Sequence, residues 1–460
     1  MTYFQSLTAL VVAAGAFAVV TAQQPPAQQP PPDQAVRTII SGSADGPPKL
    51  AVPEFIPLSK DGDVISAAKT IGDVLWDDFA YEKEFYMLPR DILRTVPRPA
   101  SAEQVAVERW RELGADAVVI GTVNKTADKK IVVEVRLINV ATNAIVAGKQ
   151  YGGSERSISD GGRIYAHSFA DEVHKTQRNL RGVARTKLAF SSDRDGARMK
   201  GPVAERDISR IYQSDYDGAN QSVLTVARSL DITPAWSPDL SEIAYTSYRS
   251  GYPDIILQSL RGARAPLTPA GGSSERHNFL PAWSPDGSKL AFMSNRDGNT
   301  EIYIVNRDGS GLRRITNHPM NDATPTWSPT GTQLAFTSDR SGTPQVYIVN
   351  IDGTGLNRIS TEGYCDRATW SPAPLNEIAY TSRTGGGYEI RIFDFNTRTS
   401  RAITDGIGSN ESPAFAPNGR HLAFVSDRTG RPQIYTIARD GTNLRQITKV
   451  GSNKFPNWSQ

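Results

Sequence analysis

Cysteine is nearly absent from this sequence: Cys365 is the only one in 460 residues, which also include just five histidines. A single cysteine excludes an intrachain disulfide framework and any metal site built from several thiolates. We expect Cys365 to be a small buried side chain, because no organised His and Asn partners accompany it. His277, His318 and His421 fall in different segments of a repeat described below, so they predict no metal site.

An excess of charge of either sign is also missing. Lys and Arg total 51 and Asp and Glu total 48, which gives a net charge of +3. This balance provides no basic surface for nucleic acid. The signatures Gly-x-Ser-x-Gly, Gly-x-Gly-x-x-Gly, His-Glu-x-x-His and the P-loop are absent as well. We therefore predict a protein with no enzymatic activity, cofactor or bound metal.

Only one apolar run is long, Leu7–Ala22, with about 16 residues. Its length and the small residues near its end are typical of a signal peptide over residues 1–22, although no Lys or Arg precedes the run. The rival interpretation is a membrane anchor, but a span needs about 20 apolar residues. No cysteine follows closely, which excludes a lipoprotein anchor. We expect export with cleavage, and a mature chain that crosses no membrane.

Glutamine and proline dominate residues 23–33, a composition that stays extended because it cannot bury a core. With the β-like string Val36–Ile40, this tract forms a predicted flexible arm over residues 23–48.

Residues 49–182 are predicted to form one α/β domain. Its expected elements are a strand at 49–55, a helix at 61–80, a helix from Ser101 with a capping box to Gln104, a hairpin of 117–123 and 131–140, a strand at 144–151 and a helix at 160–180.

The two long predicted helices carry apolar residues at helical spacing. The expected inward positions are Ile65, Ile71, Val74, Leu75, Ile164, Phe169 and Val173. His167 and His174 lie seven positions apart on the second helix, with two acidic residues between them. A metal site is conceivable there, but we favour a solvated or interdomain helix face.

From about residue 183 to 460 a repeat replaces the helical pattern. Its aromatic anchor recurs at intervals of 47, 44, 43, 45 and 43 residues, at Trp236, Trp283, Trp327, Trp370, Phe415 and Trp458. Each unit holds short β-branched or aromatic runs separated by turns such as Ser-Pro-Asp-Gly, which indicates a propeller with four strands per blade. The Asp-Gly pairs predict turns rather than calcium sites, because one Asp per turn lacks clustered oxygens.

The count of units predicts a six-bladed propeller. The first copy begins at Lys187 without a Trp strand, and the last copy stops after the Trp strand Pro456–Ser459. The two fragments complete each other, so we expect the C-terminal strand to close the ring and remove exposed strand edges.

The loops before the six anchor strands should meet at one mouth of the central channel. Loops on a rigid scaffold are common places for recognition residues, and polar and charged types dominate here. The candidate partner-binding residues are His277, Asn278, Asp322, Ala323, Thr324, Asp366 and Glu411. The alternative is that these residues serve solubility alone.

These features resemble the TolB family, periplasmic members of the Tol–Pal cell-envelope system. The resemblance rests on the Trp-Ser-Pro-Asp-Gly and Leu-Ala-Phe repeats, on Ser214–Gln221, on Leu113–Gly121 and on Phe455–Ser459. It covers about residues 35–460. Two departures are the Gln/Pro tract ahead of the arm and the turn Ser371-Pro372-Ala373-Pro374, which lacks Asp-Gly.

The resemblance implies a soluble, monomeric periplasmic adaptor. It implies that a Pal-like lipoprotein binds the propeller mouth and that a TolA-like inner-membrane protein binds the arm, while the system supports outer-membrane integrity and constriction at cell division. The implied arm residues are Val36, Arg37, Thr38, Ile39 and Ile40, a string that can add to a sheet edge.

Two other functions stay open at this point. One is a secreted propeller that binds peptide or glycan ligands unrelated to Pal. The other is the propeller module of a peptidase, against which stands the absence of a hydrolase domain within these 460 residues.

Overall fold

The computed structural model describes residues 39–42, 46–152, 162–196, 198–199, 206–225, 229–261 and 271–459. The predicted signal peptide, the Gln/Pro tract and the arm residues Val36, Arg37 and Thr38 lie outside these ranges. Residues 39–460 group into one compact unit, and the fold below is that of this unit.

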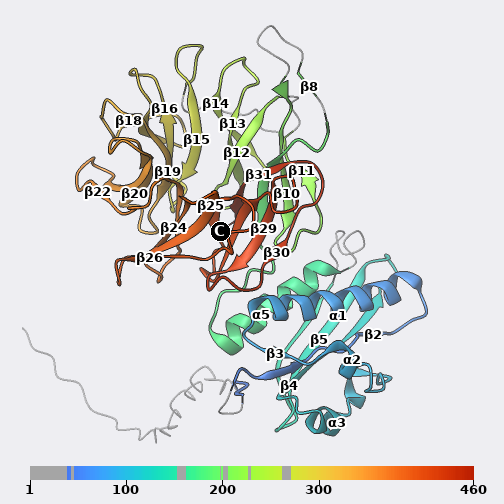
Figure 1. The fold of residues 1–460 in the computed structure, drawn as a ribbon. Coiled ribbons are helices and arrows are strands. Elements are labelled where there is room, and N and C mark those ends of the chain that lie inside the picture. The colour runs from blue at the N-terminus through green and yellow to red at the C-terminus, as the bar shows by residue number, and fades with distance from the viewer. Residues whose placement is uncertain are drawn as a thin grey trace, which may run out of the picture. The chain divides into compact units, whose positions relative to one another are not determined.

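A mixed β-sheet forms the centre of the α/β domain (Figure 1). Its strand order is β3-β1-β4-β5-β6, and β2 also pairs with β4. β4 and β5 form the predicted antiparallel hairpin, in which Val123 faces Val133. The strands are β1 (Lys49–Ala51), β2 (Ile56–Pro57), β3 (Tyr86–Met87), β4 (Ala117–Lys125), β5 (Ile131–Asn139) and β6 (Ala144–Tyr151).

Helices cover both faces of this sheet. Side chains alternate along β4, so Val119 packs with α1 and α5 on one face while Val118 and Ile120 pack with the shorter helices on the other. The helices are α1 (Gly62–Glu82), α2 (Arg90–Leu93), the 3₁₀ helix η1 (Ala102–Gln104), α3 (Val107–Glu112) and α5 (Arg163–Arg178).

Two predictions for these helices are wrong in detail. Ile65 was expected inward but is 49 % exposed, because Val64 takes the buried position in the first turn of α1. Ser101 makes no side-chain cap bond, and only a 3₁₀ turn follows it. The helix in this region is α3, which starts at Val107 and buries Trp110 against β4 and β5.

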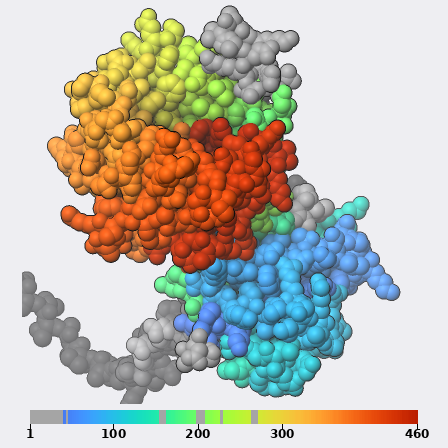
Figure 2. Space-filling model, viewed as in Figure 1, coloured from blue at the N-terminus to red at the C-terminus, as the bar shows by residue number. Residues whose placement is uncertain are grey.

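The propeller consists of six small antiparallel sheets, and its blades run from green through yellow and orange to red around the ring (Figure 2). Blade 1 contains β31 (Asn453–Trp458), β7 (Lys187–Ser192), β10 (Arg210–Asp215) and β11 (Ser222–Val223); blade 2 contains β12 (Asp231–Trp236), β13 (Glu242–Ser247) and β14 (Asp254–Ser259); blade 3 contains β15 (Asn278–Trp283), β16 (Lys289–Ser294), β17 (Glu301–Asn306) and β18 (Arg313–Arg314).

The remaining blades repeat the same strand order. Blade 4 contains β19 (Asp322–Trp327), β20 (Gln333–Ser338), β21 (Gln345–Asn350) and β22 (Asn357–Arg358); blade 5 contains β23 (Cys365–Trp370), β24 (Glu377–Thr384), β25 (Gly387–Asp394) and β26 (Thr399–Ala402); blade 6 contains β27 (Asn410–Phe415), β28 (His421–Ser426), β29 (Gln433–Ala438) and β30 (Arg445–Gln446). A small hairpin, β8 (Arg198–Met199) with β9 (Arg206–Asp207), stands apart from the blades.

The predicted closure of the ring is confirmed. β31 pairs antiparallel with β7, with Trp458 opposite Leu188 and Asn453 opposite Ser192. The Trp458 indole also donates a hydrogen bond to Thr186 Oγ1 at 2.7 Å. The C-terminal strand therefore supplies the innermost strand of blade 1, and β7 is left with no open edge.

The anchor tryptophans join neighbouring blades. The Trp283 indole donates to the Ala235 carbonyl of blade 2 at 3.1 Å, and the Trp327 indole donates to the Ala282 carbonyl of blade 3 at 3.0 Å. Both rings are also buried among apolar side chains of two blades. Cys365 is buried at the start of β23, as the sequence predicts.

Candidate partner-binding site

A central channel of about 860 Å³ passes between the innermost strands of all six blades. Its lining includes Asn179–Arg181, the segment that follows α5. Arg420, in the turn where an innermost strand ends, donates to the Arg181 carbonyl at 3.3 Å. The segment after α5 therefore lies at the end of the channel where the innermost strands finish, and the opposite end, where these strands begin, is the mouth.

Each innermost strand has the same irregularity near its start. The pairing register shifts at a β-bulge, for example between Ala323 and Thr326 of β19. One residue in every bulge is left-handed, with φ between 50° and 56°: Thr233, Leu280, Thr324, Arg367, Ser412 and Phe455. All six line the channel.

Left-handed backbone at a residue other than glycine costs on the order of 1–2 kcal/mol, and it is rarest for β-branched types such as Thr. Six such residues at equivalent positions place six side chains around one mouth. Strain of this kind is concentrated at binding and catalytic sites. All six lie in the loops that the sequence predicts at the mouth, but only Thr324 was predicted as a partner-binding residue. Four of the other five could have been found as the residue before Pro in the repeated pattern x-Pro-x-Trp or x-Pro-x-Phe, whereas Arg367 precedes Ala368 and lacks this signal.

Two of the predicted mouth residues are fully buried within their blades. Asn278 donates to Asp254 Oδ1 at 2.8 Å and accepts a hydrogen bond from Arg296 at 2.9 Å. Asp322 accepts two hydrogen bonds from Arg340 and is likewise shielded from solvent. Both side chains thus hold the loops in place and do not themselves face the mouth.

The structure does bring Thr324 and Asp366 together across neighbouring blades. Thr324 Oγ1 donates to Asp366 Oδ1 at 3.2 Å, and Thr337 donates to the same oxygen at 2.8 Å. The backbone N–H of Arg367 is a third donor, at 2.6 Å. Ala323 is partly exposed beside them. This cluster presents a fixed carboxylate at the rim between blades 4 and 5.

Arg367 links this cluster to the channel, because its Nε lies 3.7 Å from Asp366 Oδ2. Its guanidinium lies 4.6 Å from the ring centroid of Phe455, which belongs to blade 1. The two side chains come from blades that are not neighbours in the ring, since blade 6 lies between them. Both residues line the channel, so their cation–π contact lies within it.

His277 and Glu411 lie elsewhere around the mouth. The His277 ring is 6.2 Å from Phe279 in an edge-to-face contact, and Nε2 lies 3.1 Å from the Ser274 carbonyl. Glu411 accepts a hydrogen bond from Ser409 at 3.0 Å. Within the described ranges, no hydrogen bond joins either residue to the Thr324–Asp366 pair. The predicted mouth residues are therefore spread over several blades and do not form one cluster.

Apolar side chains that the sequence prediction missed stand on the same side of the ring. Met320, Ile407 and Val450 are 42 %, 58 % and 62 % exposed. Each lies in a loop two or three residues ahead of an innermost strand, which places it at the mouth. Contiguous exposed apolar surface marks protein interaction sites, whereas these three side chains lie in three separate loops.

The described end of the arm docks on the α/β domain. Ile40 is fully buried in the core formed by α1 and α5, and its backbone N–H donates to Gln177 Oε1 at 3.1 Å. Its neighbour Ile39 is 58 % exposed. The two isoleucines thus point in opposite directions, as they would in an extended strand.

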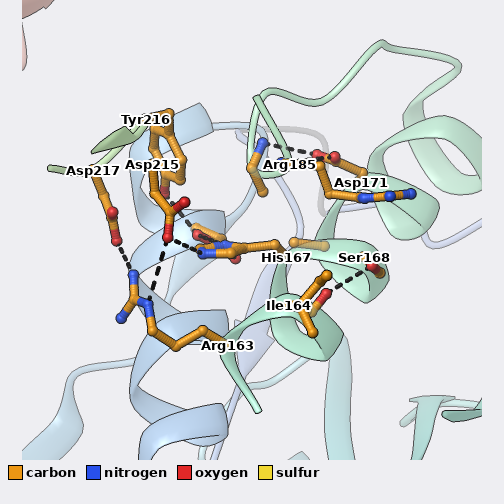
Figure 3. A network of polar contacts seen from close by, with 12 residues as sticks. Arg163, Ile164, His167, Ser168, Asp171, Arg185, Asp215, Tyr216 and Asp217 are labelled. Atoms are coloured by element: carbon orange, nitrogen blue, oxygen red, sulfur yellow. Dashed lines mark hydrogen bonds and ion pairs between the residues drawn. The ribbon is translucent and has the colours of Figure 1, made fainter. Parts of the chain in front are cut away.

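A buried polar network joins α1 and α5 to blade 1 (Figure 3). His167 Nδ1 lies 2.9 Å from Asp78 Oδ2, and the Tyr216 hydroxyl donates to Asp78 Oδ1 at 2.7 Å. Burial alone would lower the pKa of His167, but the Asp78 carboxylate raises it. Arg163 pairs with Asp217 beside them. The helix face with His167 and His174 was predicted to be solvated or interdomain. Both rings are buried, so the solvated alternative is wrong, and the contacts of His167 confirm the interdomain one.

A second set of contacts continues this interface. The ring of Tyr81 on α1 stacks on His421 of blade 6, with centroids 4.3 Å apart and planes 18° from parallel. Glu82 accepts a hydrogen bond from the Val183 N–H at 2.9 Å and pairs with Arg420. Burial holds the pKa of Glu82 above its ordinary value.

The segment that enters the propeller is held by Asp171 on α5. Its carboxylate accepts the backbone N–H group of Ala184 at 2.9 Å. It also accepts the backbone N–H group of Arg185 at 3.1 Å (Figure 3). Burial raises the pKa of Asp171 to about 6 even though both hydrogen bonds lower it.

Among the described residues, no group of three or more His, Cys, Asp or Glu side chains is arranged to hold a metal ion. In the same part of the chain, no helix combines the length and the apolar character that a membrane crossing requires.

Comparison with known proteins agrees with both halves of this fold. The TolB beta propeller domain matches residues 176–460, and the TolB amino-terminal domain matches residues 36–146. The Tol-Pal system protein TolB of Bordetella pertussis is 36 % identical over 359 residues, which span 77 % of each chain. The protein of the same name from Escherichia fergusonii is 32 % identical over 227 residues, about half of each chain.

A solved structure shows the same fold. The crystal structure of TolB from Acinetobacter baumannii superposes with a TM-score of 0.70 at 24 % identity, and the match covers 90 % of this chain and 97 % of that one. The two-domain architecture is thus common to both proteins.

Proposed function

The chain belongs to the TolB family of the Tol–Pal system, and on this basis we propose that it is a non-enzymatic periplasmic adaptor. It binds a Pal-like lipoprotein at the propeller mouth and a TolA-like inner-membrane protein through the arm residues 36–40. Through these two contacts it supports outer-membrane integrity and constriction at cell division.

The observation that carries this proposal is the ring of six left-handed residues at one mouth. Their equivalent positions fix six side chains around a single opening. Exposed Met320, Ile407 and Val450 add apolar surface on the same side. A rigid mouth with an apolar rim and fixed polar groups suits a folded partner. Binding then orders few further side chains or loops, so it loses little conformational entropy.

The proposed contact residues are His277, Ala323, Thr324, Asp366 and Glu411, together with Arg367 and Phe455. Asn278 and Asp322 act through the loops that they anchor. For the arm, the opposed orientation of Ile39 and Ile40 supports a strand that adds to a partner's sheet edge.

Calorimetric titration with the periplasmic domain of a Pal-type lipoprotein tests the mouth. We expect Ile407→Asp and Asp366→Lys each to weaken binding about tenfold, which corresponds to about 1.4 kcal/mol. The matched control is Leu312→Asp, at a position 45 % exposed in the turn between β17 and β18, on the other side of the ring.

The outcomes separate two parts of the proposal. If the intact protein does not bind the lipoprotein, the adaptor role is wrong. If it binds, and the mouth variants bind as well as the Leu312→Asp control, the adaptor role stands and the mouth assignment is wrong.

A further inference from the structure

The α/β domain contains a second cavity, of about 300 Å³, on the face of the sheet that α2 and α3 cover. All of its lining residues belong to this domain, so the cavity is separate from the propeller channel. The lining is Val52, Pro53, Glu54, Ile56, Gly72, Asp73, Trp76, Arg90, Leu93, Arg94, Val96, Pro97, Arg98, Pro99, Val105, Ala106, Trp110 and Ile120.

Two tryptophans form rigid walls of this cavity. The Trp76 indole donates to the Leu88 carbonyl at 3.1 Å, and the Arg90 guanidinium lies 4.6 Å from its ring centroid. Trp110 is packed against Ile120 and Ile138 in the core of this face. With Val52, Ile56, Leu93 and Val105 on the remaining sides, most of the lining is aliphatic or aromatic. Water against these apolar walls finds few hydrogen-bond partners, and an apolar group displaces it favourably.

Three arginines stand among the polar lining residues, and two of them have carboxylate partners. Arg90 bonds to Asp73 at 2.5 Å and to Asp77 at 3.0 Å, and Arg98 pairs with Glu54. Arg94 is exposed and has no carboxylate partner anywhere in the described part of the chain. The cavity therefore carries one uncompensated guanidinium, the side chain best suited to bind a carboxylate through two hydrogen bonds.

We propose that this cavity binds a small amphipathic carboxylate, with its apolar body between Trp76 and Trp110 and its carboxylate on Arg94. The volume is that of about ten water molecules and lies at the lower end of small-molecule sites, so the ligand is a small molecule. The apolar lining favours a ligand with an apolar body, and the Arg94 guanidinium favours a ligand with a negative charge. This site goes beyond the adaptor role and shares none of the residues assigned to it.

The probe for the test is octanoate, with 1-octanol and octylammonium as matched neutral and cationic chains. Each is titrated into the full chain by calorimetry, and tryptophan fluorescence is recorded in parallel. We expect octanoate to bind with one site per chain and to change the emission, and the other two chains to bind at least about tenfold more weakly. Absence of octanoate binding, or equal binding of octanol, overturns the proposal.

Two variants locate the site. We expect Arg94→Ala to weaken octanoate binding about tenfold. The control is Arg109→Ala, which removes the same charge from an exposed position on α3 outside the cavity lining. Ala106→Trp, at an exposed lining position, should fill the opening and abolish binding.

Circular dichroism melts show whether each variant remains folded. If a folded Ala106→Trp protein binds octanoate normally, or Arg94→Ala and Arg109→Ala weaken it equally, the ligand lies elsewhere and the assignment is wrong.

Discussion

Arg340 Nη2 donates hydrogen bonds to both carboxylate oxygens of Asp322, at 2.9 and 2.7 Å, across the first hairpin of blade 4. The guanidinium also lies 5.4 and 5.1 Å from the ring centroids of Phe336 and Tyr347. Three other blades use the same device with asparagine in place of aspartate, in the pairs Arg296–Asn278, Arg428–Asn410 and Arg194–Asn453. The start of each of these innermost strands is thus tied to the turn between the second and third strands.

Removal of this arginine should destabilise the propeller strongly. Arg340→Met leaves the buried Asp322 carboxylate without its cation, and loss of one partner from a buried pair costs about 3–5 kcal/mol. Urea unfolding followed by fluorescence measures the change.

Asp322→Asn provides the control, because asparagine occupies this position in the neighbouring blade 3. We expect Asp322→Asn to change the free energy of unfolding by less than about 1.5 kcal/mol, the size of one hydrogen bond. Equal destabilisation by Arg340→Met and Asp322→Asn would show that the charge pair is not the cause.

Deletion of residues 452–460 should open the ring. The truncated protein loses β31, so β7 presents an unpaired edge. Leu188 also loses its packing against the Trp458 ring. We expect a lower melting temperature and concentration-dependent association, seen by calorimetry and by size-exclusion chromatography. Trp458→Phe keeps the strand and serves as the milder control. A truncated protein that stays monomeric and melts normally would contradict closure by this strand.

His421 should make stability depend on pH. Burial and the nearby Arg420 charge lower the pKa of His421 to about 3, whereas an unfolded histidine titrates near 6.5. Below pH 6.5 the unfolded chain therefore binds a proton that the folded protein does not. The stability contributed by the neutral ring is complete above pH 6.5 and falls by about 1.4 kcal/mol per pH unit down to about pH 3.

His421→Phe keeps a ring against Tyr81 and removes the titration. The difference in unfolding free energy between the two proteins, measured from pH 8 to pH 5, should be constant above about 6.5 and move in favour of the variant below it. A difference that stays constant over the whole range would show that His421 titrates normally in the folded protein.

Tyr216 should couple the α/β domain to the propeller. Tyr216→Phe removes a buried donor to Asp78 and should cost about 1–3 kcal/mol. The expected calorimetric signature is a broadened or divided unfolding transition, because the lost bond joins two domains. Tyr212→Phe is the matched control: it removes a hydroxyl bonded to Asp195 at 2.7 Å within the same blade. If both variants melt alike, Tyr216 has no special role between the domains.

The repeat in the sequence was enough to predict the architecture of the propeller. The spacing of Trp283 and Trp327 reports the blade period, and the complementary fragments at Lys187 and Trp458 report the closure. Both features depend on residues that recur at fixed intervals, so the pattern can be read without knowledge of side-chain contacts.

The site residues were harder to place, because burial depends on partners that are distant in sequence. Asn278 and Asp322 look like exposed loop residues until their arginines, 18 positions later, are seen to fold back on them. His167 and Asp78 are 89 positions apart. The left-handed backbone at Arg367 and Phe455 follows from a β-bulge in each strand. The alternation of apolar and polar residues does not predict where such a bulge falls.

The closure of blade 1 also sets an order of events for folding. Synthesis delivers β7 long before β31, since the other five blades lie between them in the chain. Until β31 arrives, the innermost position of blade 1 is vacant and β7 keeps an unsatisfied edge. The ring therefore closes only when all six blades exist, so a partly made propeller has no complete channel mouth.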